Sequence, residues 1–112
     1  MSVVLIEKQS PQITVLTLNR PERRNALTLE LLTQLSAAIR TASDDSQTRV
    51  IILRGAGAAF CTGLDLKEAA DQTKAHATAE MVARTLITVS QTHLVTITAV
   101  HGAAVAGGAG SP

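Results

Sequence analysis

Short apolar runs alternate along this chain with longer stretches in which apolar residues recur every three or four positions. The runs at 3–7 and Ile13–Leu18 are predicted to form two strands. Ser10-Pro11-Gln12 lies between them and predicts the turn of an antiparallel hairpin. The polar segment that follows, residues 19–25, predicts a loop.

The next stretch has the spacing of an amphipathic helix. Thr28 is a plausible N-cap for a helix running to about Ala42, and Ser43-Asp44-Asp45-Ser46 would end it. One apolar stripe results from the spacing of Leu29, Leu32, Leu35 and Ile39.

Val50-Ile51-Ile52-Leu53 is a continuous run of the kind found in strands buried on both faces. It predicts a sheet that helices cover on both sides. Residues 67–77 are helical in pattern but polar, so we expect a mobile segment there. A second long helix is predicted over 78–92, with Val82, Leu86 and Val89 on its inner face, followed by a strand at 97–100. The order β-β-α-β-α-β predicts an α/β fold.

Length and charge narrow the classes of function. With 112 residues the chain forms at most one small domain, and one Phe with no Tyr or Trp leaves a core of Leu, Val, Ile and Ala. The formal charge of +1 argues against nucleic acid or an acidic membrane surface as a partner. The single cysteine, Cys61, excludes an internal disulfide. No targeting segment or membrane span is visible, so we expect a cytoplasmic protein, with a processed organellar form left open.

Two glycine-containing turns carry the candidate chemistry. Phe60-Cys61-Thr62-Gly63-Leu64-Asp65-Leu66 and Ala106-Gly107-Gly108-Ala109-Gly110 each follow a predicted apolar strand. The backbone N–H groups of Leu64 and Gly107 could face one ligand oxygen, and two such donors make an oxyanion hole. The alternative is that both runs are merely tight strand-to-helix turns, and the residues alone leave both interpretations open.

Three motifs resemble one known family. Asn19-Arg20-Pro21-Glu22-Arg23-Arg24-Asn25-Ala26-Leu27 is similar to the N-terminal motif of the crotonase (enoyl-CoA hydratase/isomerase) superfamily. Val50-Ile51-Ile52-Leu53-Arg54-Gly55 with the Gly63 turn resembles its first oxyanion segment, and the run from Ala99 to Gly110 resembles its second. The resemblance implies an α/β fold built on the spiral ββα core of the ClpP/crotonase type. It further implies that residues 1–112 are the N-terminal part of a crotonase-like domain, with the C-terminal half absent.

The resemblance also implies roles for individual residues. The amides of Leu64 and Gly107 match the two oxyanion donors. The backbone of Ala26 matches a contact with the adenine of coenzyme A, and Arg24 matches a basic position near its phosphates, the alternative being a solvated loop arginine. Asp65 and Leu66 match the groove for CoA and pantetheine. The remaining positions that the resemblance assigns to CoA or substrate are Leu27, Gly63, Lys67 and Gly108.

One position departs from the hydratase pattern. Gly110 stands where a two-glutamate hydratase carries its first catalytic glutamate, and the second has no counterpart in this sequence. We therefore expect an acyl-CoA or enoyl-CoA binding enzyme that stabilises an enolate. The alternative is a non-catalytic fragment that binds CoA weakly or only oligomerises. CoA is part of the substrate, so no separate cofactor is expected. The family implies a homo-oligomer, trimer or hexamer, and an unpaired sheet edge predicts self-association.

Other chemistry-bearing residues receive plainer interpretations. Cys61 fits packing better than nucleophilic attack, and His76, His93 and His101 are too scattered for a metal site. Asp65 fits a helix cap. We expect Glu68, Asp71 and Glu80 to be solvated. The glycines of Gly55-Ala56-Gly57-Ala58-Ala59-Phe60 imitate a dinucleotide fingerprint, but Phe60 stands where that motif needs a small residue.

Overall fold

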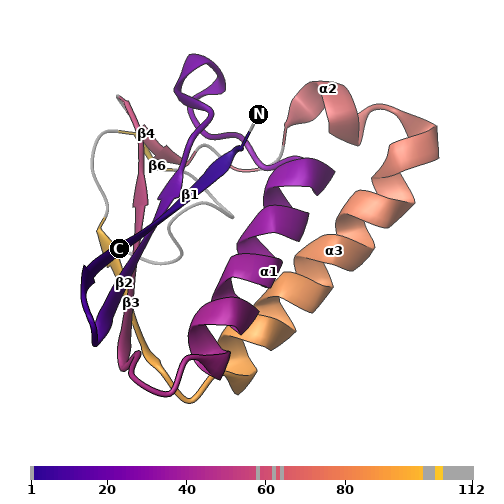
Figure 1. The fold of residues 1–112 in the computed structure, drawn as a ribbon. Helices are drawn as coiled ribbons and strands as arrows, with labels where there is room; N and C mark the ends of the chain where they lie inside the picture. Colours follow the sequence, from indigo (N-terminus) through magenta and orange to yellow (C-terminus); the bar gives the residue numbers. More distant parts are fainter. Residues whose placement is uncertain (1, 58, 62, 64, 100–102, 105–112) are drawn as a thin grey trace.

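A four-stranded mixed sheet with two long helices on one side forms the body of the molecule (Figure 1). The computed structural model describes residues 2–57, 59–61, 63, 65–99 and 103–104. The sheet has the order β1-β2-β3-β5, and a separate pair joins β4 to β6. The strands are β1 (Val4–Ser10), β2 (Ile13–Leu18), β3 (Val50–Gly55), β4 (Ala59–Cys61), β5 (Val95–Ala99) and β6 (Ala103–Ala104).

The predicted hairpin is confirmed, because β1 and β2 pair antiparallel with Val4 opposite Leu18. β2, β3 and β5 then run parallel, with Leu16 opposite Leu53 and Ile52 opposite Ile97. The helices are η1, a 3-10 turn (Pro21–Arg23), α1 (Leu29–Asp44), α2 (Leu66–Ala69) and α3 (Gln72–Gln91). The predicted order β-β-α-β-α-β is therefore confirmed for β1, β2, α1, β3, α3 and β5, and the short strands β4 and β6 were not predicted.

Helix α1 forms where its apolar stripe predicted it. Thr28 is the N-cap, and its hydroxyl accepts a hydrogen bond from the Leu31 N–H at 3.2 Å. Such a cap contributes about 1 kcal/mol to helix stability. Leu35 and Ile39 of α1 pack into one core with Leu16 and Ile51 of the sheet.

The expectation of helices on both faces of the sheet is wrong for the described residues. α1 and α3 lie on the same face (Figure 1). The chain crosses from β2 to β3 and from β3 to β5 in the same direction across the sheet, and right-handed crossovers then place both helices on one side. Of the run at 50–53 only Ile51 is fully buried. On the opposite face Val95 and Ile97 are 59% and 50% exposed.

The polar segment at 67–77 is helical, as its pattern predicted, and its expected mobility stays a prediction. It contains most of α2 and the first turns of α3, which begins six residues before the predicted start. Asp71 explains the early start, because its carboxylate caps α3 by accepting a hydrogen bond from the Thr73 N–H at 2.9 Å. α3 is only shallowly packed: its buried residues are Thr78 and Thr85, while Leu86 is 64% exposed.

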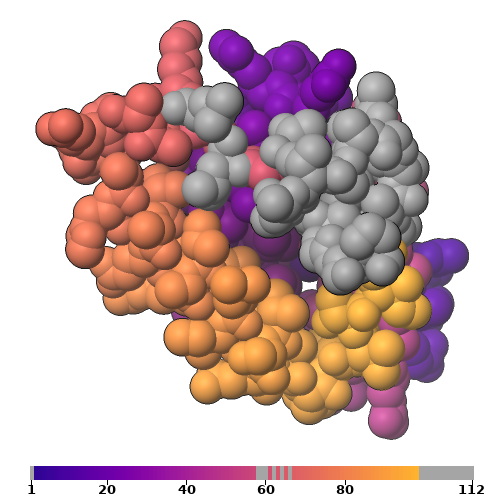
Figure 2. All heavy atoms as spheres, turned by 180° about the vertical axis from the view of Figure 1, so that it is seen from behind, coloured from indigo at the N-terminus to yellow at the C-terminus, as the bar shows by residue number. Residues whose placement is uncertain are grey.

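The surface seen in Figure 2 carries α3 and β5, in orange and yellow. Both elements expose large apolar side chains, including Leu86, Ile87, Val95 and Ile97. Among the described helices, none is long and apolar enough to cross a membrane.

Candidate functional site

The candidate site lies at the carboxyl ends of the parallel strands. β2 ends at Leu18 and β3 at Gly55, and the loops that follow them meet at this edge of the sheet (Figure 1). In α/β folds, ligands bind outside the carboxyl ends of the strands. The first loop carries the Asn-Ala-Leu motif. The second is the whole segment between β3 and α2, which contains the short strand β4 and then the Gly63 turn.

Asn25 determines the shape of the first loop. Arg24 and Asn25 both have left-handed backbones, with φ of 52° and 57°. Asparagine tolerates this conformation better than most residues. Its side chain is fully buried, donates from Nδ2 to the Ala56 carbonyl at 2.9 Å, and accepts at Oδ1 from the Arg20 N–H at 2.8 Å. One side chain therefore closes the first loop and ties it to the second.

Leu27 joins the two loops through its backbone. Its N–H donates to the Gly63 carbonyl at 2.7 Å, and its carbonyl accepts from the Asp65 N–H at 2.8 Å. This is the pair of bonds that links neighbouring parallel strands. Gly63 is buried and has a φ of 94°, a conformation that favours glycine. The residues on both sides of Leu64 are therefore fixed to the first loop.

An ion pair reinforces the same connection. The Arg20 guanidinium lies 3.4 Å from Asp65 Oδ2 and donates to the Ala26 carbonyl at 2.7 Å. Both charged side chains are about 15% exposed. Asp65 Oδ1 also accepts from the Glu68 N–H at 3.1 Å, which confirms its role as a helix cap. The Glu68 N–H, and after it the Arg20 guanidinium, lower the pKa of Asp65 against the opposing effect of burial.

The expectation that Glu68 is solvated is wrong. Its Oε1 accepts from the Leu29 N–H in the first turn of α1 at 2.6 Å and from the Thr78 hydroxyl at 3.2 Å. A carboxylate is stabilised at a helix N-terminus by the helix dipole. Glu68 therefore ties α2 to both long helices. Glu80 matches the expectation, since it is exposed and pairs with Arg84 on its own helix.

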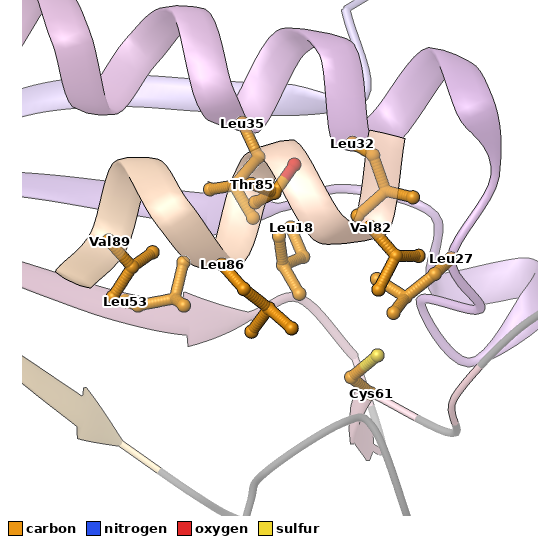
Figure 3. Close-up of a pocket in the computed structure, with 10 residues that line it drawn as sticks. All are labelled: Leu18, Leu27, Leu32, Leu35, Leu53, Cys61, Val82, Thr85, Leu86 and Val89. Carbon is orange, nitrogen blue, oxygen red and sulfur yellow. The ribbon is translucent and has the colours of Figure 1, made fainter. Parts of the chain in front are cut away.

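An apolar cavity of about 160 Å³ lies between the sheet and α3 (Figure 3). The predicted inner face of the second helix borders it, with Val82, Leu86 and Val89 among the lining residues. Cys61 lies at one end. Its thiol is buried, which raises its pKa, and donates to the Asn25 carbonyl at 3.1 Å. A buried thiol with a raised pKa is a poor nucleophile, so the packing interpretation of Cys61 holds.

The structure brings some of the predicted site residues together. Leu27, Gly63 and Asp65 are in direct contact, and Ala26 is buried beside them. Arg24 and Lys67 are exposed at the rim of the two loops. Leu66 begins α2, and its side chain lies outside what the structure describes. Four predicted positions fall outside the described residues: Leu64, Gly107, Gly108 and Gly110.

Sequence reasoning missed the contribution of Arg20 and Glu68. Arg20 follows β2, and Asp65 lies in the segment after β3, the parallel neighbour of β2. Their opposite charges at the same edge of the sheet were the signal that could have predicted the pair. In the part of the chain that the structure describes, no group of three or more His, Cys, Asp or Glu side chains could hold a metal ion. His101 lies outside that part.

Comparison with known proteins gives a consistent result. The family model for enoyl-CoA hydratase/isomerase matches residues 8–110. A probable enoyl-CoA hydratase echA12 of Mycobacterium bovis is 34% identical over 96% of this chain and 41% of its own length. The probable enoyl-CoA hydratase EchA14 of Mycobacterium tuberculosis is 39% identical over 86% of this chain and 38% of its own. The crystal structure of enoyl-CoA hydratase from Bacillus anthracis superimposes with a TM-score of 0.88 and 33% identity, covering 96% of this chain and 43% of that one.

The hairpin and the parallel crossovers are thus those of a crotonase-type α/β fold. The chain belongs to the enoyl-CoA hydratase/isomerase family. It spans about two fifths of the length of the curated relatives that it matches.

Proposed function

We propose that this chain binds an acyl-CoA thioester and polarises its carbonyl with the backbone N–H groups of Leu64 and Gly107. The observation that carries the proposal is a pair of hydrogen bonds: the Leu27 N–H donates to the Gly63 carbonyl, and the Leu27 carbonyl accepts from the Asp65 N–H. The carbonyl of Gly63 and the N–H of Leu64 belong to one peptide unit, and in a trans unit the two point in opposite directions. A fixed Gly63 carbonyl therefore supports a fixed direction for the Leu64 N–H.

The chemistry that such donors supply is stabilisation of an enolate. When a base removes a proton from the carbon beside the thioester carbonyl, the electron pair moves onto the carbonyl oxygen. Each well-placed N–H donor to such an oxygen is worth about 3 kcal/mol. Gly110 carries no carboxylate, so the base must be another group than the first glutamate of the hydratase pattern. The proposal therefore assigns to these residues carbonyl polarisation and not the activation of water.

The rim of the two loops suits the CoA portion of the substrate. Arg24 and Lys67 are exposed and basic, and phosphate groups of CoA are their natural partners. Calorimetry with CoA should show weaker binding for Lys67→Gln than for the parent chain. Lys74→Gln, which removes the same charge from α3, is the matched control and should bind as the parent does.

An isotope label on the thioester carbonyl tests the central claim. Bound crotonyl-CoA should show a carbonyl stretch at lower frequency than free crotonyl-CoA in infrared difference spectra. Cys61 allows ligation of residues 1–60 to a synthetic 61–112 in which an ester replaces the Gly63–Leu64 amide and so removes the Leu64 N–H. The downshift should then fall to about half, because one of two donors is lost.

A second ester variant controls for the loss of a backbone hydrogen bond in general. An ester at Ala83, in the middle of α3, removes a helical N–H away from the two loops and should leave the downshift unchanged. An unchanged downshift in the Leu64 ester would refute the oxyanion role. Binding of crotonyl-CoA with no downshift in the parent chain would favour the non-catalytic alternative.

A further inference from the structure

Arg20 stands in the N-terminal motif, but the family resemblance gave its side chain no role. It leaves the first loop and lies 84% buried between that loop and the turn that carries Leu64. Nη1 donates to the Ala26 carbonyl at 2.7 Å, and Nη1 and Nη2 both lie 3.4 Å from Asp65 Oδ2. One guanidinium thus contacts the residue before Leu27 and the residue after Leu64.

We propose that Arg20 is a positioning residue, which holds Asp65 against Leu27 and so fixes the C-terminal side of the turn that begins at Gly63, while the Leu27–Gly63 bond fixes its N-terminal side. The proposal rests on the oxyanion role of Leu64 given above. Arg20 does not touch the reacting atoms. It acts on the second of the two Leu27 bonds, the one from the Asp65 N–H to the Leu27 carbonyl at 2.8 Å.

The geometry requires an arginine. A guanidinium carries several N–H donors in a rigid plane, so it can bond a carbonyl and a carboxylate at the same time. A lysine has a single ammonium centre on a flexible stem. Burial removes competing water from the pair, and the Arg20 backbone is itself fixed because its N–H donates to Asn25 Oδ1 at 2.8 Å. The fixed base of the side chain allows the guanidinium to define the position of Asp65.

Amide hydrogen exchange tests the positioning role without a ligand. In Arg20→Lys, the Asp65 amide should exchange about tenfold faster, the effect of weakening a bond of about 1.4 kcal/mol. The amide of Ile52 in the centre of the sheet should keep its rate. Arg49→Lys makes the same substitution at the opposite end of the parallel strands, at an exposed residue, and should change neither rate. Equal acceleration at Asp65 and Ile52 would mean global destabilisation and would overturn the proposal, as would an unchanged Asp65 rate.

The labelled thioester provides the second readout. Arg20→Lys should reduce the carbonyl downshift of bound crotonyl-CoA to about half, while the affinity for CoA without an acyl group stays as in the parent. Asp65→Asn should reproduce the loss, and the double variant should lose no more than the larger single variant, because both act on one contact. A full downshift in Arg20→Lys would refute the role. If the parent chain shows no downshift, the proposed oxyanion hole fails, and the exchange rates still decide whether Arg20 positions Asp65.

Discussion

Replacing Asn25 by alanine should destabilise the fold, because the Asn25 side chain bridges the two loops. The substitution removes the bond from Nδ2 to the Ala56 carbonyl at 2.9 Å and the bond from the Arg20 N–H to Oδ1 at 2.8 Å. Alanine must also adopt the φ of 57° that Asn25 has in the native loop.

The magnitude follows from these terms. A buried polar group that loses its partner costs about 1–3 kcal/mol. The partners lost are the backbone N–H of Arg20 and the backbone carbonyl of Ala56, and both residues taken as a whole are only partly buried, so the lower end applies, about 1 kcal/mol for each bond. The left-handed backbone adds about 1 kcal/mol for alanine, because alanine lacks the local side-chain hydrogen bonds that let asparagine adopt this conformation. Asn25→Ala should therefore lower the free energy of unfolding by about 3 kcal/mol, and Asn25→Gly by about 2 kcal/mol, because glycine avoids the backbone term.

Urea denaturation followed by far-ultraviolet circular dichroism is the suitable assay, since the chain has no Trp or Tyr for fluorescence. The midpoint should fall while the dependence on urea concentration stays constant. Asn19→Ala is the matched control: its side chain makes one long bond, 3.4 Å to the Ser2 carbonyl, and should cost less than about 1 kcal/mol. A cost of Asn25→Ala equal to that of the control, or to that of Asn25→Gly, would refute the reasoning.

Three further changes give separate predictions. Gly57→Ala should lower stability in the same assay by about 2 kcal/mol, because a Cβ would meet the Pro21 Cβ at 2.7 Å and φ is 81°; an unchanged midpoint would contradict this. Folding lowers the pKa of Asp65, chiefly through the hydrogen bond from the Glu68 N–H. The ionised carboxylate therefore stabilises the fold above the unfolded pKa of about 4, and this contribution is lost as the pH falls through the folded-state pKa. Asp65→Asn should therefore flatten the loss of stability below about pH 4, and an unchanged acid slope would count against it. Ile97→Lys should reduce self-association in light scattering, because Ile97 is 50% exposed on an apolar sheet face; a monodisperse monomer for the parent chain would exclude that self-association.

Local patterns were sufficient to predict most of the elements. The hairpin and α1 depend on short-range signals, a turn in one case and Thr28 with its apolar stripe in the other, and both are confirmed. The start of α3 was missed because its first turns carry polar residues, and the Asp71 cap outweighs the absence of an apolar face there. Polarity predicts exposure of a helix but does not prevent the helix from forming.

Long-range arrangement accounts for what the sequence could not predict. The burial of 50–53 was overestimated, because the hydrophobic run does not reveal on which side the crossovers place their helices. The Arg20–Asp65 pair joins residues 45 positions apart, and the Glu68 bond to Leu29 joins residues 39 apart. Such contacts follow from the parallel register of β2 and β3, which no local pattern contains. The roles of Leu64 and Gly107 stay predictions.

The two hydrogen bonds of Leu27 close a loop in the chain that contains all of α1 and β3. Closing a loop of that length costs conformational entropy, which the packing of α1 against the sheet and the pairing of β3 with β2 offset. The turn at Gly63 therefore depends on the folded chain. A peptide spanning residues 56–69 would lack the Leu27 bonds that hold this turn. The shape of this turn is consequently coupled to the global stability of the core, so substitutions in α1 far from the loops can alter the site without touching it.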